Sequence, residues 1–272
     1  MSLIKYPAYR RPRLYAAAGL IGAMATWLAF GSLQPAQAAV LQVSPVRLQF
    51  ESAQSAQALQ VFNSGQNPLE AQVRVMRWTQ EGGADRLIPA TDVVASPAIM
   101  RVAPGNRQTV RIVRLKPTPA ADEQTYRVLI DELPQETPAK GVGLKILLRY
   151  SIPVFIAASS AKPADPADDA QAPHKTDLSR VCAQFTPRRG GGTELRFSNN
   201  SPRALRISSV TAVSTDGKQQ LLEDGLLGYV LPGKQMGWAI KSPAPLTAGL
   251  ALKARFNDDT DAQAVPLEGT CR

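Results

Sequence analysis

The residue types that carry most enzyme chemistry are scarce in this chain. His174 is the only histidine, and it lies in a stretch rich in Ala, Pro, Asp and Ser. A single histidine removes any Ser-His-Asp arrangement and any histidine-based zinc site. The two cysteines cannot complete a structural zinc site either. The sequence therefore favours a binding module over an enzyme, and we expect no metal and no cofactor.

Two further motifs could carry chemistry. The adjacent carboxylates Asp258 and Asp259 could do acid and base work, but such a pair is more typical of a solvated turn. The glycine-rich stretch "RGGGTE", residues 189–194, lies between strand-like segments and not between a strand and a helix. A hairpin turn is the better interpretation than a phosphate-binding loop.

The N-terminal 38 residues have the pattern of a secretory signal peptide. Four basic residues precede an uncharged run of about 17 residues from Leu14 to Phe30. The small residues Ala36 and Ala38 then occupy the A-x-A cleavage positions. A retained membrane anchor is the alternative, but the run is short for one. We expect export through the secretory route, with cleavage before Ala39.

Export would change the net charge of the mature chain and the expected oxidation state of its two cysteines. Removing residues 1–38, which carry four basic and no acidic groups, lowers the formal net charge from +9 to +5. A mildly basic surface is weak evidence for nucleic acid, and we expect no nucleic-acid partner. Cys182 and Cys271 should form a disulfide in an oxidising compartment. Closing a loop of about 90 residues could stabilise the fold by roughly 4 kcal/mol in the chain-entropy model.

Short strand-like segments separated by turn residues fill the chain from residue 40 to residue 155. They are "LQVSPVRLQF", "QALQVFN", "EAQVRVMRW", "DRLIPA", "AIMRVAP", "RQTVRIVRL", "TYRVLIDEL" and "GLKILLRYSIPVF". Strands at this spacing predict an antiparallel β-sandwich. The last segment is apolar at every second position at Val142, Leu144, Ile146 and Leu148. Taken alone, such a strand most often covers its own core.

A second β-domain follows an Ala- and Pro-rich stretch. Residues 159–174 lack large apolar side chains and predict a flexible linker. After it, "GTELRFSNNSPRALRISSVTAV" repeats the strand, Asn-turn, strand pattern of residues 57–75. The expected organisation is a signal peptide over 1–38, a first sandwich over 39–158, the linker over 159–174 and a second sandwich over 175–272. The fold class is therefore all-β, with no significant helix.

The order of these motifs resembles the PapD-like family of periplasmic pilus-assembly chaperones. The motifs are "VSPVRLQF", "VFNSGQNP", "VRVMRWTQ", "SPAIMRVAPGNRQTVRIVR", "YRVLIDELP" and "LKILLRYSIPVF". "RYSIPVF" and the short loop "PQETPAKGVG" are closest in style to the archaic branch. The resemblance implies two immunoglobulin-like domains at an angle, like a boomerang. It also implies pilus subunits that lack a strand, and an outer-membrane usher, as partners.

The resemblance assigns roles to several residues. The strand holding Val142, Leu144, Ile146 and Leu148 matches the one that the family donates into the open groove of a subunit. Arg47 matches an arginine that holds the C-terminal carboxylate of the subunit, as a guanidinium can do with two parallel hydrogen bonds. An exposed residue without a ligand is the alternative for Arg47.

Two basic members of the family pattern are missing here. Pro153 occupies the position of a second, lysine anchor. Arg149 and Arg127 are substitute candidates for that anchor, and pairing with Asp131 or Glu132 is the alternative for Arg127. Ala157 stands where the charge cluster between the domains has a basic residue.

Glu132 and Asp258 match the acidic members of that interdomain cluster. Self-association of the unloaded protein is a further implication of the resemblance, on which the residues favour neither state. The alternative function is an exported two-domain adhesion or carbohydrate-binding protein, which predicts aromatic side chains gathered at a surface.

Overall fold

The computed structural model describes residues 40–117, 119–134, 146–159, 176–188, 191–240 and 250–267. Within these ranges every regular element is a β-strand, which confirms the all-β prediction. In the same ranges no helix has the length and hydropathy needed to cross a membrane. The predicted signal peptide lies outside the described residues, and so does the predicted linker apart from Ser159.

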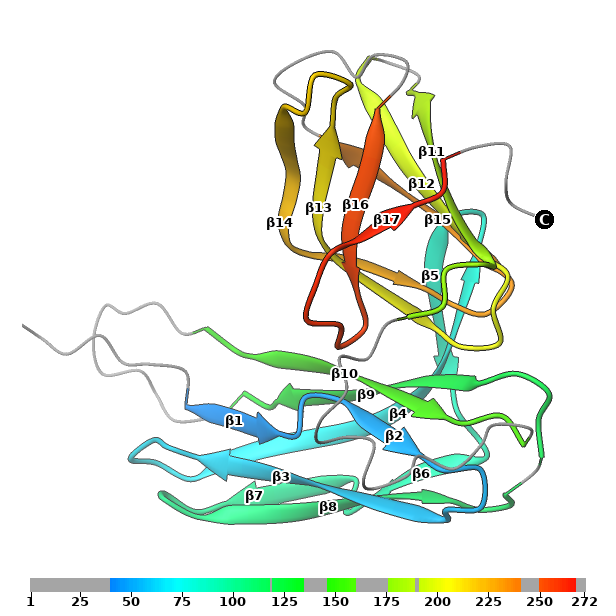
Figure 1. Cartoon of the computed structure of the whole chain (residues 1–272). Coiled ribbons are helices and arrows are strands. Elements are labelled where there is room, and N and C mark those ends of the chain that lie inside the picture. Colours follow the sequence, from blue (N-terminus) through cyan, green and yellow to red (C-terminus); the bar gives the residue numbers. More distant parts are fainter. Residues whose placement is uncertain are drawn as a thin grey trace, which may run out of the picture. The chain divides into compact units, whose positions relative to one another are not determined.

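The first sandwich consists of two sheets (Figure 1). One sheet has the order β1 (Leu41–Ser44), β3 (Ala56–Asn63), β8 (Arg107–Arg114), β6 (Val93–Ser96). The other has the order β2 (Leu48–Phe50), β10 (Arg149–Ile156), β9 (Gln124–Glu132), β4 (Leu69–Glu81), β5 (Ala84–Pro89), and β7 (Ile99–Val102) also pairs with β4. Both sheets contribute alternate side chains to one apolar core, for example Val61, Ile112, Val128 and Ile152.

The second sandwich has a core of its own. Its three-stranded sheet has the order β11 (Val181–Pro187), β12 (Thr193–Asn199), β15 (Lys234–Ile240). Its four-stranded sheet has the order β14 (Gln219–Val230), β13 (Leu205–Val213), β16 (Ala251–Phe256), β17 (Gln263–Val265). No strand pairing among the described residues joins the two sandwiches, although the predicted domain boundaries themselves stay a prediction.

The first predicted strand, "LQVSPVRLQF", is two strands in two different sheets. β1 pairs antiparallel with β3, whereas β2 pairs parallel with β10. The Ser44–Pro45 peptide bond between them is cis, and Pro45 has no N–H to continue a ladder. The alternating pattern continues on both sides of this break, which is why the sequence alone does not reveal it. The switch places Arg47 immediately before β2.

The repeated strand, Asn-turn, strand pattern corresponds to a repeated structural device. Asn63 ends β3 and Asn199 ends β12, and both side chains are fully buried. Each amide donates to the carbonyl four residues later at 2.8 Å and to a carbonyl on another strand at 2.9 Å. Each Oδ1 accepts a backbone N–H two residues later. One buried side chain thus satisfies the backbone groups of each turn.

We expect Asn199→Ala to lower the free energy of unfolding by about 2 to 3 kcal/mol, because it leaves buried carbonyl and N–H groups without partners. Asn200 is the matched control, since it is exposed and adjacent, and Asn200→Ala should change stability by less than about 0.5 kcal/mol. Urea unfolding of the two variants measures both. Equal effects of the two substitutions would contradict the role given to Asn199.

Candidate functional site

Strand β10 has one edge that is only partly paired. Along its whole length it pairs antiparallel with β9. On its other side β2 pairs only with Val154–Ile156. Among the described residues no strand covers that side of residues 149–153. The edge therefore presents backbone groups to which another strand could add.

The hydrogen-bond pattern shows which residues face this open edge. The Glu132 N–H donates to the Leu148 carbonyl at 3.0 Å, so Leu148 faces β9. Because an antiparallel ladder alternates, Arg149 and Ser151 turn their N–H and C=O groups away from β9. The Ala157 N–H donates to Phe50 on the same outer side. Pro153 also faces outward, so its missing N–H removes no bond to β9.

The apolar residues predicted for the donated strand fall at and beyond the start of β10. Val142 and Leu144 lie outside the described residues. The structure has no regular strand at residues 146–148. Ile146 is 68% exposed, whereas Leu148 is half-buried and packs against the core of the first sandwich. Of the two described members of the set, only Ile146 is thus freely exposed.

Arg149 is one of three arginines predicted as carboxylate anchors, and it already has a carboxylate partner. Its Nε donates to Asp131 Oδ1, and Arg74 Nη2 lies 2.7 Å from Asp131 Oδ2. Burial alone would raise the pKa of Asp131, but the hydrogen bonds and charges of Arg149 and Arg74 outweigh it and lower that pKa. This ion-pair group lines an open pocket of about 480 Å³ with Glu132 and Leu147.

Arg127 has no such partner. Its guanidinium carbon lies 3.7 Å from the centroid of the Trp78 ring and 5.3 Å from that of Tyr229. Within the described part of the chain no carboxylate forms an ion pair with Arg127, so the predicted alternative of pairing with Asp131 or Glu132 is not observed. Burial lowers the pKa of this guanidinium, which nevertheless stays charged at neutral pH. Arg127 is an aromatic-stacked cation that donates to the Ser151 carbonyl at 3.4 Å and forms no ion pair with a carboxylate among these residues.

The register places Arg127 directly beside Pro153. The two residues are Cα partners in the β9–β10 ladder, and they form a pair without mutual backbone hydrogen bonds, in which side chains lie closest. Arg149 is four residues farther along the same strand, about 13 Å away at the usual rise per residue. Arg127 therefore lies across from the position where the resemblance expects lysine, whereas Arg149 does not.

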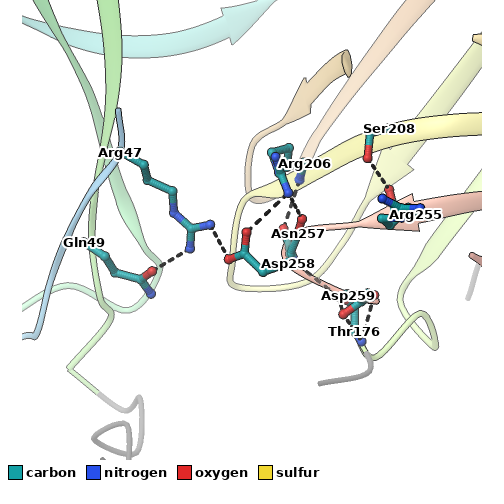
Figure 2. A network of polar contacts seen from close by, with 9 residues as sticks. All are labelled: Arg47, Gln49, Thr176, Arg206, Ser208, Arg255, Asn257, Asp258 and Asp259. Atoms are coloured by element: carbon teal, nitrogen blue, oxygen red, sulfur yellow. Dashed lines mark hydrogen bonds and ion pairs between the residues drawn. The ribbon is translucent and has the colours of Figure 1, made fainter. Parts of the chain in front are cut away.

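Arg47 contacts the neighbouring ring of the same aromatic group. Its guanidinium carbon is 5.7 Å from the centroid of the Phe155 ring, and the Phe155 and Trp78 rings are 6.3 Å apart. Nη1 donates to Asp258 Oδ2 at 2.7 Å, and Nη2 donates to Gln49 Oε1 at 2.6 Å (Figure 2). Asp258 follows β16, so this ion pair joins the two sandwiches. Arg47 and Arg127 thus each contact one ring of an adjacent pair.

Further contacts between the sandwiches surround these rings. Trp78 and Phe155 pack against Leu231 and Tyr229 of the second sandwich. The Gln80 amide donates to the Tyr229 carbonyl and accepts from the Leu231 N–H, both at 2.9 Å. We call Trp78, Phe155, Tyr229 and Leu231 the inter-sandwich cluster. Sequence alternation indicates that Trp78 is buried, but not that its neighbours belong to the other domain.

The two predicted interdomain acids are placed differently. Asp258 contacts Arg47 and also lies 3.3 Å from Arg206 Nη2. The Glu132 carboxylate instead accepts from the Leu148 N–H at 3.3 Å, within the first sandwich. Glu123, which the sequence analysis does not single out, accepts from the Ala204 N–H of the second sandwich at 2.8 Å. A lone Glu in a turn carries no sequence signal for such a contact.

Burial raises the pKa of Glu123, although its bond to the Ala204 N–H and the charges of Arg203 and Arg47 oppose this. The folded protein therefore holds this proton more tightly than the unfolded chain. Stability from this group is lost as pH rises above 4.5 and through the higher folded-state pKa. We expect the stability of Glu123→Gln relative to the unsubstituted protein to increase from pH 4 to pH 7 in urea unfolding. A pH-independent difference would contradict this.

One of the two cysteines lies in the described part of the chain. Cys182 is buried on β11 and is not a free thiol. Cys271 lies outside the described residues, so the disulfide between them stays a prediction. Across the described ranges no group of His, Cys, Asp and Glu side chains has the arrangement of a metal site.

Comparisons with known proteins bear on this arrangement. Residues 40–161 match the family described as pili and flagellar-assembly chaperone, PapD N-terminal domain. No curated protein sequence matches the chain.

Solved structures with the same fold include the CsuC-CsuE chaperone-tip adhesion subunit pre-assembly complex from archaic chaperone-usher Csu pili of Acinetobacter baumannii. That match has 24% identity and a TM-score of 0.61, and it covers 84% of this chain and 98% of the other. The E. coli chaperone DraB matches at 22% identity, with a TM-score of 0.53 and coverage of 84% and 96%. The Salmonella enterica SafA pilin in complex with the SafB chaperone matches at 17% identity, with a TM-score of 0.54 and coverage of 85% and 96%.

These structural likenesses span both sandwiches and confirm the predicted fold of two immunoglobulin-like domains. The family match covers the sandwich that carries β10, Arg47 and Arg127. The resemblance seen in the sequence motifs is confirmed: residues 40–161 match the N-terminal domain of the PapD-like pilus-assembly chaperones.

Proposed function

We propose that this chain is a non-enzymatic periplasmic chaperone that caps pilus subunits by donating a strand and then passes them to an outer-membrane usher. The observation that carries the proposal is the open edge of β10. No strand among the described residues pairs with this edge at Arg149 and Ser151, although the Ser151 carbonyl accepts from Arg127 Nη1 at 3.4 Å, and the exposed Ile146 lies shortly before it. A subunit that lacks a strand would pair with this edge and cover the apolar side chain.

The proposed donated segment is residues 142–150. Val142, Leu144, Ile146 and Leu148 are its groove-filling side chains, and each fully buried one would contribute about 1.5 to 3 kcal/mol before the cost of association. Ile146 has the exposure that such a role requires. Leu148 is held partly by the core of its own domain, so its share at the interface should be smaller.

Arg47 and Arg127 are the proposed anchor for the C-terminal carboxylate of the subunit. Arg47 contacts the Phe155 ring and Arg127 the adjacent Trp78 ring, and Arg127 is the cross-strand neighbour of Pro153. The cation expected on β10 would thus be supplied from β9. Arg149 is less suited, because it lies four residues from Pro153 on β10, about 13 Å away at the usual rise per residue. Charged hydrogen bonds at such a partly desolvated site are stronger than at an open surface.

Other features complete the proposal. The signal pattern over residues 1–38 supports the periplasm, where Cys182 and Cys271 would be oxidised. Replacement of the donated strand by that of the next subunit would release the cargo without a cofactor. The motif "RYSIPVF" and the short preceding loop favour the archaic branch of the family.

Co-expression with small secreted subunits encoded beside this chain tests the proposal. We expect a soluble one-to-one complex that co-purifies from the periplasm, and an aggregated or degraded subunit when the chaperone is absent. If the subunits fold and stay soluble alone and never co-purify with this chain, the proposal is wrong.

The adhesion alternative finds no support in the exposed side chains. It predicts aromatic residues gathered at a surface, but no exposed large hydrophobic side chain in the described ranges is aromatic. Trp78 is 1% exposed, and Trp238 packs against the core of the second sandwich.

A further inference from the structure

The guanidinium of Arg47 already forms an ion pair with a carboxylate of the same chain. Asp258 Oδ2 lies 2.7 Å from Nη1, and Gln49 Oε1 accepts from Nη2 (Figure 2). A carboxylate needs two neighbouring N–H groups to bind an arginine in parallel fashion. In this structure one of those donors is therefore engaged by Asp258.

We propose that Asp258 is an intramolecular competitor for the anion site at Arg47. It occupies the site in the unloaded protein and is displaced by the carboxylate of a partner. This inference rests on the proposed role of Arg47, and it adds a regulatory contact to that role. The competitor belongs to the second sandwich, so loading the site would break one polar contact between the sandwiches.

The partner of Asp258 can change without leaving a carboxylate unpaired. Asp258 Oδ1 also lies 3.3 Å from Arg206 Nη2, and Arg206 donates to the neighbouring Asn257 carbonyl (Figure 2). A carboxylate that leaves Arg47 would therefore keep a cation beside it. This second partner lowers the cost of displacement.

The turn that carries Asp258 is held by other bonds. The buried Asp259 accepts from the Thr176 N–H at 3.2 Å and from Gln263 Nε2 at 2.7 Å. Asn257 Nδ2 lies 3.2 Å from Thr176 Oγ1. The position of the turn thus does not depend on the ion pair with Arg47. Only the Asp258 side chain, which is 68% exposed, has to move.

The exposure of the pair sets the size of the effect. The Arg47 side chain is 32% exposed and that of Asp258 68%, and ion pairs at such surfaces contribute little because water and salt screen them. A competitor of this strength should weaken binding of a carboxylate by about two- to fivefold. Asp258 would lower the affinity of the site for a carboxylate without preventing binding.

The test is a titration of the 15N-labelled protein with N-acetylglycine, a minimal chain-terminal carboxylate, followed by NMR at the Arg47 side-chain N–H groups. N-acetylglycinamide is the uncharged control ligand. Asp261→Asn is the matched control variant, since it removes one negative charge from the same loop without touching Arg47. We expect Asp258→Asn to bind N-acetylglycine about two- to fivefold more tightly than either the unsubstituted protein or Asp261→Asn.

Two contrary results have separate meanings. Equal affinity of all three proteins would overturn the competition while leaving Arg47 as an anion site. Absence of binding at Arg47 even in Asp258→Asn would overturn both the competition and the proposed anchor. Neither result would affect the donated strand, which the subunit complex tests independently.

Discussion

Ile146→Asp is expected to abolish the complex with a pilus subunit while the chaperone itself stays folded. Ile146 is 68% exposed and lies before β10, so the substitution removes little packing from the first sandwich. In the complex the same position would enter an apolar groove, where an unpaired carboxylate is costly to bury. The lost apolar contact and the buried charge together should weaken binding by about 100-fold or more.

The control for this variant is Ile99→Asp. Ile99 is 62% exposed on β7 of the same sandwich, away from the open edge of β10. Thermal unfolding should place both variants close to the unsubstituted protein, and co-purification with the subunit should fail only for Ile146→Asp. A soluble complex of normal affinity with Ile146→Asp would remove the donated strand from the proposal.

The strands themselves could largely be predicted, because their signal is local. Alternation along β3 and β8 follows directly from one buried and one outward face. The break between β1 and β2 could not be predicted, because the same alternation of apolar residues is compatible with a strand in either sheet. The predicted strand over residues 142–155 is likewise regular only from Arg149 in the described part of the chain. The period of the apolar residues indicates which face of a sheet a residue occupies, but it does not indicate at which residue the strand pairing begins.

The candidate site depends on contacts between residues that are distant in the chain, so less of it could be predicted from the sequence. The motif around Arg47 identifies it, but its partner Asp258 is 211 residues away. Arg127 is one of two substitutes for the missing lysine, and only the cross-strand register with Pro153 favours it over Arg149. Glu123 and Gln80 carry no local signal, because their partners belong to the second sandwich.

Trp78→Ala is expected to lower the free energy of unfolding by about 3 to 5 kcal/mol, the usual cost of removing a buried tryptophan. Trp78 is 1% exposed and meets Tyr229 edge to face at a centroid distance of 5.4 Å. The substitution also removes the ring on which Arg127 stacks. The loss should therefore exceed that of a core residue touching only its own sandwich, and urea unfolding measures it.

Trp78→Phe distinguishes the contribution of the aromatic ring from that of the indole N–H group. The indole Nε1 is buried and has no hydrogen-bond partner among the described residues, so phenylalanine loses no hydrogen bond there and keeps an aromatic face for Arg127. We expect Trp78→Phe to retain most of the stability that Trp78→Ala loses. If both variants unfold like the unsubstituted protein, the inter-sandwich cluster contributes little to stability. The contacts around Arg127 would then be too loose to position an anchor.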